Sequence, residues 1–330
     1  MDPFNLIVYV VLSLVIIVGL LTTMAYMTWF ERRVISRLQA RIGPNTVGWQ
    51  GLLQPLADAV KLFFKEDIRP MTADSLLFPL APAISLFAAL ASFAVLPVGP
   101  TLNVGGAEIP LQVAELPVGV VYLLAASSLG VYGLVLGGWG SGSKYSLLGA
   151  LRAAAQVVSY ELILGISIVS VTIVSGTLSL GGIVNAQANS VWYVVLQPVA
   201  FVLFMIAGVA ETNRAPFDLP EAESELVAGY HTEYSGMRFA MYFIAEYVAM
   251  ITMSAVAATL FFGGWTFPFL PGGPWWLIIK MSFFLFLFVW LRATLPRLRY
   301  DQLMRLCWAV LLPIGLLNVA ITAIVVAAIG

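Results

Sequence analysis

The 330-residue sequence is poor in charge, in cysteine and in histidine. Charged residues make up 10% of the chain and hydrophobic residues 61%, and the mean hydropathy is +0.96. A soluble domain of this length needs a mostly polar surface, so this composition excludes a soluble protein. It suits a multi-span membrane protein, in which lipid solvates the outer surface and each helix satisfies its own backbone hydrogen bonds.

Cysteine and histidine each occur once, as Cys307 and His231. Within the chain itself this excludes a disulfide framework, a cysteine-ligated iron–sulfur cluster, a bis-histidine haem and a conventional zinc site. If the protein takes part in redox chemistry, a partner must therefore deliver the electrons.

Apolar runs long enough to cross a bilayer recur along the whole chain. They predict an all-α integral membrane protein with about eight transmembrane helices, in one integral domain over residues 1–330. The first run follows Asp2 rather than a basic segment, so we interpret it as a retained span and not a signal peptide. The predicted spans lie near residues 5–30, 76–97, 115–138, 147–174, 191–212, 237–262, 275–292 and 303–328.

Basic residues fall on one side of these spans. Of the sixteen lysines and arginines, fifteen lie in the first, third, fifth and seventh loops or in the span ends next to them, and only Lys280 does not. By the positive-inside rule these odd-numbered loops are cytoplasmic and both termini lie on the opposite side. Lys280 is expected either to pair with a glutamate in the membrane or to extend to the nearer interface.

The first loop contains a segment with helical periodicity. Between residues 50 and 65, apolar side chains recur at helical spacing on one side, while Gln54, Asp58 and Lys61 take the opposite side. Such an amphipathic helix is expected to lie in the plane of the membrane interface. It either braces the membrane surface or frames an entrance for an amphiphilic substrate, and periodicity does not separate the two interpretations.

Four carboxylates occupy positions where lipid is expected. Glu161 and Glu246 lie inside predicted spans, Glu115 opens the third span and Glu211 closes the fifth. An ionised side chain at the centre of a membrane helix costs about 2.5–3.5 kcal/mol, so unpaired carboxylates are rare there. Either each is a neutral or ion-paired packing residue, or together they form a proton path.

The fifth loop, residues 211–236, is the most acidic stretch of the chain and holds six carboxylates. Glu221 and Glu225 are four residues apart and would share one face of a helix, where like charges perturb both pKa values. The candidate counter-charges on the same side of the membrane are Arg214, Arg238 and Arg292.

Four segments from the odd-numbered loops carry a resemblance to a known family. They are "ERRVISRLQARIGPNTVGWQGLLQPLADAVKLFFKED", "SKYSLLGALRAAAQVVSYE", "ETNRAPFDLPEAESELVAGYHTEYSG" and "RATLPRLRYDQLM". They closely resemble the NuoH-type membrane subunit of bacterial respiratory complex I, the proton-translocating NADH:quinone oxidoreductase. The resemblance covers nearly the whole length in order, and it implies a multi-pass protein of the bacterial inner (plasma) membrane.

The resemblance implies that quinone enters from the bilayer between the first span, the amphipathic helix and the sixth span. Quinone would then bind at the interface with partner subunits, and no catalytic residue, metal or flavin is expected on this chain. The expected quinone-channel residues are Glu31, Arg32, Arg33, Arg41, Asp58 and Lys61. The expected proton-path residues are Glu115, Glu161, Glu211, Glu221, Glu223, Glu225, Glu246 and Arg292.

The implied partners are the hydrophilic-arm subunits that carry the terminal iron–sulfur cluster and the quinone head-group site, the small neighbouring membrane subunits, the antiporter-like subunits and membrane lipid. No nucleic acid is expected. The leading hypothesis is a quinone-binding and proton-coupling subunit. Two alternatives stay open, namely a stand-alone secondary transporter and the homologous subunit of a membrane-bound nickel–iron hydrogenase or ferredoxin-dependent complex.

Overall fold

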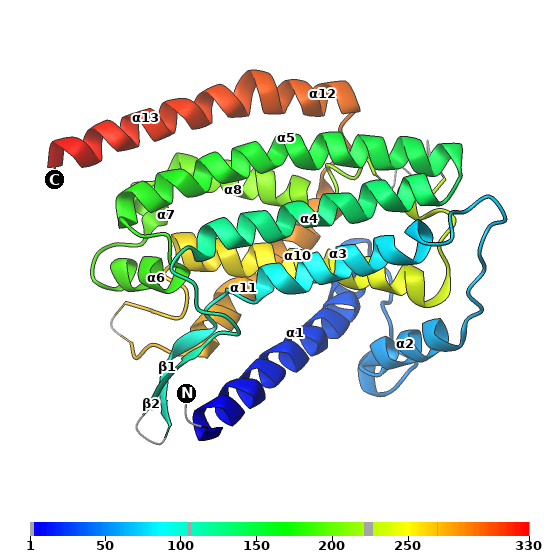
Figure 1. Ribbon diagram of the computed structural model, residues 1–330, viewed down its shortest axis with the longest axis horizontal. Helices are drawn as coiled ribbons and strands as arrows, with labels where there is room; N and C mark the ends of the chain where they lie inside the picture. Colours follow the sequence, from blue (N-terminus) through cyan, green and yellow to red (C-terminus); the bar gives the residue numbers. More distant parts are fainter. Residues whose placement is uncertain (1–2, 105–106, 221–226, 269, 330) are drawn as a thin grey trace.

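The computed structural model describes residues 3–104, 107–220, 227–268 and 270–329. Over these residues the protein is a bundle of helices with one short β-hairpin (Figure 1). The apolar helices are α1 (Pro3–Leu38), α3 (Leu77–Phe93), α4 (Gly119–Gly140), α5 (Lys144–Ser175), α8 (Pro198–Glu211), α10 (Gly236–Phe261), α11 (Pro274–Thr294) and α13 (Leu312–Ile329). The shorter elements are η1 (Trp49–Gly51), α2 (Gln54–Phe64), α6 (Leu180–Ala188), α7 (Tyr193–Leu196), η2 (Gly229–His231), α12 (Tyr300–Arg305) and the π-helical η3 (Leu306–Leu311).

Among the described residues, six helices are long and apolar enough to cross a membrane. The prediction of an all-α membrane protein is therefore confirmed. The six are α1, α4, α5, α10, α11 and the continuous run from α12 to α13. Helices α3 and α8 are apolar but shorter. Their 17 and 14 residues extend about 26 and 21 Å, against a hydrocarbon thickness of about 30 Å.

The helix in the predicted span 191–212 is divided. Helix α7 ends before Gln197, whose backbone (φ −130°, ψ 56°) is not helical, and α8 starts with Pro198. Proline has no N–H to donate and its fixed φ suits the first helical position, so the chain restarts a helix there. The prediction of one continuous helix is wrong here, because average hydropathy does not detect a break at one residue.

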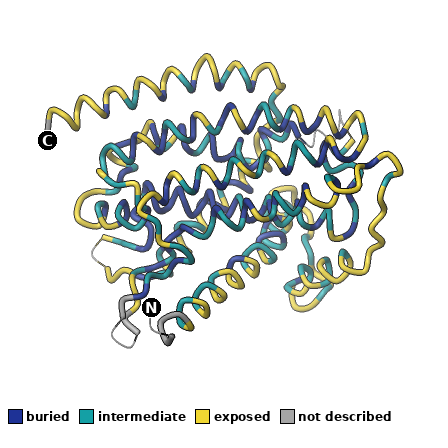
Figure 2. The backbone as a smooth tube through the Cα atoms, in the orientation of Figure 1, coloured by how far each residue is buried: buried dark blue, intermediate teal, exposed yellow. Residues whose placement is uncertain are grey.

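Helix α10 lies at the centre of the bundle. In an 18-residue apolar stretch of α10, 78% of the residues are buried. The corresponding shares are 11% for α1 and 17% for the run from α12 to α13. It contacts α3, α11 and α1, while α4 packs between α3 and α5, and α5 between α4 and α8. Figure 2 shows the outer faces of α1 and α13 as exposed. Any side chain that α10 holds is therefore fixed by packing from several helices.

Close packing around α4 depends on glycine. A Cβ added at Gly133 would lie 2.0 Å from Ser85 Oγ on α3, and one at Gly138 would lie 2.3 Å from Ala150 Cβ on α5. Small residues of this kind let membrane helices approach closely. The resulting contacts hold α3, α4 and α5 side by side next to α10.

Two elements project from opposite ends of the bundle (Figure 1). At the first, here called the α2 end, the predicted amphipathic helix forms as α2, and its Leu56, Val60, Phe63 and Phe64 are exposed. At the other, the hairpin end, β1 (Gly99–Val104) pairs antiparallel with β2 (Ala107–Leu111). The hydropathy pattern does not predict a hairpin at this position.

Candidate functional site

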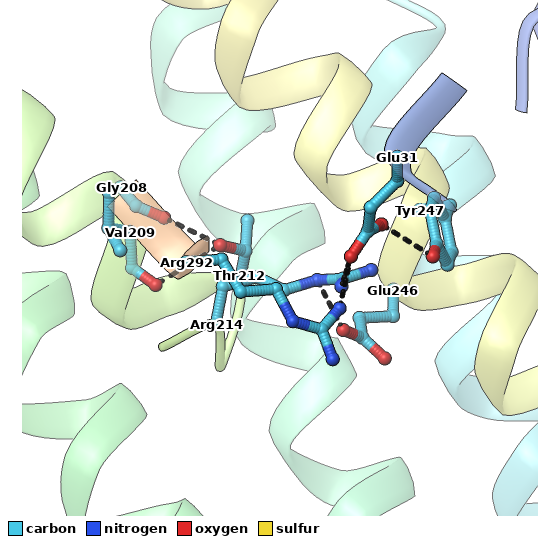
Figure 3. Close-up of polar contacts among 8 residues, drawn as sticks. All are labelled: Glu31, Gly208, Val209, Thr212, Arg214, Glu246, Tyr247 and Arg292. Carbon is cyan, nitrogen blue, oxygen red and sulfur yellow. Dashed lines mark hydrogen bonds and ion pairs between the residues drawn. The ribbon is translucent and has the colours of Figure 1, made fainter. Parts of the chain in front are cut away.

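Two carboxylates and two guanidinium groups meet inside the α2 end of the bundle (Figure 3). Arg214 donates from Nη1 to Glu31 Oε1 at 2.9 Å, and its Nε lies 2.7 Å from Glu246 Oε1. Arg292 donates to the same Oε1 of Glu31. Glu31 comes from α1, Glu246 from α10 and Arg292 from α11, so the group ties three helices to the segment after α8. We call it the Glu31–Arg214 network.

The backbone after α8 turns sharply to bring Arg214 into this network. The Thr212 hydroxyl donates to the carbonyl oxygens of Gly208 and Val209, each at 3.1 Å, in the last turn of α8. Asn213 then adopts φ of 51°, a left-handed conformation that asparagine tolerates better than most residues. The sequence "ETNRAP" thus ends α8 and reverses the chain within four residues.

The network is buried except for Arg292, which is exposed at its edge, and its formal charges balance. The side chains of Arg214 and Glu31 are 5% and 4% exposed, Glu246 is 16% exposed and Arg292 is 37% exposed. Burial by itself would lower the pKa of Arg214, but Glu246 and Glu31 more than offset this effect and the pKa is raised. Removing one member of such a group leaves an uncompensated buried charge.

Tyr247 belongs to the same network, although its sequence context does not single it out. Its hydroxyl donates to Glu31 Oε2 at 2.6 Å, and the Arg214 guanidinium lies over its ring, 4.5 Å from the centroid. Both oxygens of Glu31 therefore have donors. One tyrosine among twelve carries no distinctive pattern in the sequence, and only its place beside Glu246 could have indicated a role.

The first loop folds back on α1 through its polar residues. Arg32 pairs with Asp58 of α2 at 2.7 Å, and Lys61 lies 3.8 Å from the same carboxylate. Arg33 donates to the backbone oxygen of Gln50 at 2.6 Å. These contacts fix α2 beside the last turns of α1. Four of the six expected quinone-channel residues are thus close to one another.

The other two expected channel residues differ in their surroundings. Glu31 lies in the buried network, whereas Arg41 is exposed beyond the end of α1. A groove of about 350 Å³ runs between α1 and α11 in the turns that precede Glu31. It is lined by Thr22, Thr23, Tyr26, Met27, Trp29, Phe30, Ser282 and Leu285.

The expected proton-path carboxylates Glu211 and Glu246 line one cavity of about 100 Å³ between α3, α4 and α10. Glu211 Oε2 is buried and has no hydrogen-bond partner among the described residues. Hydroxyl groups of Ser85 and Thr252 also line this cavity. Six further lining residues carry polar groups, so a water molecule in the cavity has several possible partners; they are Ser92, Ser127, Thr212, Asn213, Tyr230 and Tyr242.

Glu161 lies close enough to Glu211 for their charges to interact, although it does not line the cavity. It extends from α5 toward α4, where it is hydrogen-bonded to the hydroxyl of Ser128. The carboxylates of Glu246, Glu211 and Glu161 therefore follow one another from α10 to α5. Only Glu246 of these three joins the Glu31–Arg214 network.

Four of the expected proton-path residues are not part of this arrangement. Glu221, Glu223 and Glu225 lie outside the described residues. Glu115 is exposed and precedes the first residue of α4, Gly119, at the hairpin end. The expectation that Glu115 opens a membrane helix is wrong, because Pro117 and the loop after β2 delay the start of α4.

Arg238, the third candidate counter-charge, and Lys280 bind other partners. Among the described residues, Arg238 pairs with Asp67 of the first loop at 3.0 Å. Lys280 pairs with no glutamate among the described residues. Its Nζ donates to the carbonyl oxygens that follow α10, at 2.6, 2.9 and 2.5 Å for Phe262, Gly264 and Thr266.

The fold and this site define a class. The protein is a multi-span helical membrane protein in which a buried, charge-balanced network adjoins a line of carboxylates between helices. Neither a lipid-facing packing surface nor a simple anchor requires such groups, because burying ionisable side chains in a membrane protein is costly.

Comparisons with known proteins identify the family. The family model described as NADH dehydrogenase matches residues 11–323. The chain is 58% identical to the NADH-quinone oxidoreductase subunit designated H of Thermomicrobium roseum, over 98% of each chain. It is 55% identical to the NADH-quinone oxidoreductase subunit designated H 2 of Geobacter metallireducens, over 95% of this chain and 94% of the relative. The chain belongs to the NADH dehydrogenase family, and the resemblance that its loops carry is confirmed.

Proposed function

We propose that this chain is the membrane subunit of a proton-translocating NADH:quinone oxidoreductase that frames the quinone channel and passes the effect of quinone reduction to a line of carboxylates. The names of its relatives support the enzyme class. The observation that carries the coupling is Arg214, which binds Glu31 on the channel side and Glu246 on the path side.

The channel side is formed by α1, α2 and the helices next to them. The apolar side chains of α2 are exposed, which suits a helix that lies in the membrane interface where an amphiphilic quinone enters. The Arg32–Asp58 pair holds α2 against α1 and keeps this entrance in shape. Quinone would then be reduced deeper in, at the interface with partner subunits.

Quinone reduction would be coupled to the carboxylates because the negative charges near Glu31 and the carboxylate of Glu246 compete for the guanidinium of Arg214. When quinone reduction draws protons from its surroundings, negative charge appears near Glu31, and Arg214 is attracted toward it. Two unit charges 4 Å apart interact by about 4 kcal/mol at an effective dielectric constant of 20, so weakening the pair with Glu246 is a large change. Glu246 then takes up a proton from its surroundings.

The path side begins at the cavity that Glu246 shares with Glu211. Its volume of about 100 Å³ is enough for about three water molecules at about 30 Å³ each. Water there would connect the two carboxylates, and Glu211 would hand the proton to Glu161. Glu221, Glu223 and Glu225 of the acidic fifth loop would supply protons from the cytoplasm.

The chain needs partners for this reaction. With one cysteine and one histidine it depends on hydrophilic-arm subunits for electrons, and antiporter-like membrane subunits would complete proton translocation. The proposed location is the bacterial inner membrane, with the odd-numbered loops in the cytoplasm and both termini on the other side. The α2 end of the bundle would then face the hydrophilic arm.

The test replaces Glu211 or Glu246 by glutamine in the assembled enzyme. Each variant should assemble, but coupled turnover should fall about ten-fold or more, the effect of about 1.4 kcal/mol on a barrier. Glu233→Gln is the matched control, because it makes the same change in the fifth loop at a residue that does not line the cavity. Normal turnover and proton pumping in both variants would contradict the proposal.

A second measurement examines assembly. Purification of the native protein in mild detergent should yield partner subunits that carry iron–sulfur clusters. A monomer that transports ions by itself would refute the proposal in favour of a secondary transporter. A partner with cysteine pairs able to hold nickel would instead indicate a hydrogenase.

A further inference from the structure

Ser128, in the middle of α4, connects Glu161 to the backbone of a neighbouring helix. Its Oγ lies 2.8 Å from the carbonyl oxygen of Leu124, one turn earlier on α4. It is also within hydrogen-bonding distance of Glu161 Oε1 on α5. Ser128 and Glu161 are both half-buried, at the line where α4 and α5 pack against each other.

The hydroxyl of Ser128 has one proton and two acceptors within reach. A hydroxyl donates one hydrogen bond and can accept others, whereas an ionised carboxylate only accepts and a protonated one also donates. If Glu161 is ionised, Ser128 must turn its proton to Glu161. If Glu161 is protonated, the carboxylic acid can donate to Ser128 Oγ while Ser128 donates to Leu124. Each protonation state thus has a complete hydrogen-bond arrangement.

We propose that Ser128 is a positioning residue that supports Glu161 in both of its protonation states. This inference rests on the proposed proton path through Glu161. Without the hydroxyl, ionised Glu161 loses its donor from α4. A hydrogen bond to the ionised carboxylate is stronger than one between neutral groups, so its loss disfavours the ionised form of Glu161 more than the protonated form. When Glu161 gains or loses a proton, the Ser128 hydroxyl rotates, and the helices do not need to rearrange.

Among the described residues, other titratable groups around Glu161 do not provide the same support. Glu211, at the end of α8, is a second carboxylate close enough for the two charges to interact, and it offers no donor when ionised. On α5 itself the Tyr160 hydroxyl donates to the Leu303 carbonyl at 3.1 Å, and from η3 the Cys307 thiol donates to the Ser159 carbonyl at 3.3 Å. Tyr132 follows Ser128 by one turn of α4 and is exposed.

The test compares two nearly isosteric replacements in the assembled enzyme. Ser128→Thr keeps the hydroxyl, and Ser128→Val has the shape of that threonine with a methyl group in place of the hydroxyl. Infrared difference spectra of the enzyme would follow the protonated carboxyl band of Glu161, assigned by its loss in Glu161→Gln. In Ser128→Val the pH midpoint of this band should rise by about one unit, the value of one hydrogen bond to a charged group. Ser128→Thr should keep the native midpoint.

Ser167→Ala is the matched control, because this buried serine of α5 donates to the Leu164 carbonyl of its own helix at 2.7 Å. It should leave the midpoint unchanged. An unchanged midpoint in Ser128→Val would overturn the role of Ser128, even if Glu161→Gln abolishes pumping. Native pumping in Glu161→Gln would instead contradict the proton path itself, so the two failures are distinguishable.

Discussion

Two parts of α10 are held by different chemistry, one nearer the α2 end of the bundle and the other at the hairpin end. At the α2 end, Glu246 and Tyr247 of α10 bind ionised side chains, in the Glu31–Arg214 network. At the hairpin end, the polar side chains of Lys280 and Gln187 bind backbone groups. Lys280 donates to the carbonyl oxygens of Phe262, Gly264 and Thr266, and Gln187 donates to those of Thr259 and Leu260 at 2.9 and 3.1 Å.

The difference indicates which end of α10 responds to charge. Carboxylates change their charge with protonation, and an arginine between two of them can shift its balance. Backbone carbonyls do not titrate, and a cation at a helix C-terminus also interacts favourably with the helix dipole. The hairpin end of α10 is therefore a fixed point, and the α2 end is where quinone chemistry can act. Three predictions test this comparison.

The largest effect is expected from Arg214→Met. The variant leaves Glu31 and Glu246 without their shared cation inside the protein, and breaking a buried ion pair costs about 3–5 kcal/mol. The amount of assembled enzyme in membranes, measured on native gels, should fall strongly. Arg214→Lys keeps the charge but cannot make the forked contacts, so it should assemble better and still couple poorly.

Restoring neutrality separates charge from packing in that variant. Arg214→Met combined with Glu246→Gln removes one carboxylate with the cation and should recover part of the lost assembly. If the double variant assembles no better than Arg214→Met, the loss comes from packing and the network does not act through its charge.

An intermediate effect is expected from Lys280→Met, which keeps the length of the side chain and removes the ammonium. Three carbonyl oxygens lose a donor, and an unsatisfied buried group costs about 1–3 kcal/mol. Thermal inactivation should occur at lower temperature, while the KM for quinone and the pH profile of turnover stay native. A changed pH profile would show that the hairpin end also takes part in coupling.

Much of the fold could be predicted from the sequence, because hydropathy and charge are properties of long segments. The eight apolar runs and the amphipathic segment all correspond to helical structure. The break at Gln197 and the β-hairpin could not be predicted, since each depends on a few backbone conformations. Hydropathy averaged over about nineteen residues does not resolve such features.

The site could be predicted only in part. Glu31 was expected in the channel, and Glu246 and Arg292 in the path, from the family resemblance. Arg214 brings these residues together, and it lies 183 positions from Glu31 in the sequence. A contact between residues so far apart could not be predicted from local sequence patterns. The donors Tyr247, Ser128 and Gln187 were missed because tyrosine, serine and glutamine are common and gain a role only from the acid or carbonyl beside them. Glu115 was expected in the path from the family resemblance and at the start of a span from hydropathy, and α4 starts only at Gly119.

The smallest effect concerns His231, which lies beside the first turns of α10 at the α2 end. Its ring packs 4.9 Å from Tyr230 and 5.5 Å from Phe239, between ring centroids. Burial lowers the pKa of His231 to about 4, from about 6.5 in an unfolded chain. The unfolded chain therefore takes up this proton first as the pH falls. The stability that neutral His231 contributes is complete above about pH 6.5 and is lost toward pH 4.

His231→Gln, which does not titrate, should remove this part of the acid sensitivity. Between pH 6.5 and 5.5 the native protein should lose about 1 kcal/mol more stability than the variant, because only its unfolded state gains a proton in that range. Thermal denaturation of the assembled enzyme across this range measures the difference. Lys280→Met should keep the native slope, since its effect lies at the hairpin end and involves carbonyl groups. An equal change of slope in both variants would contradict the assignment of acid sensitivity to the α2 end of α10.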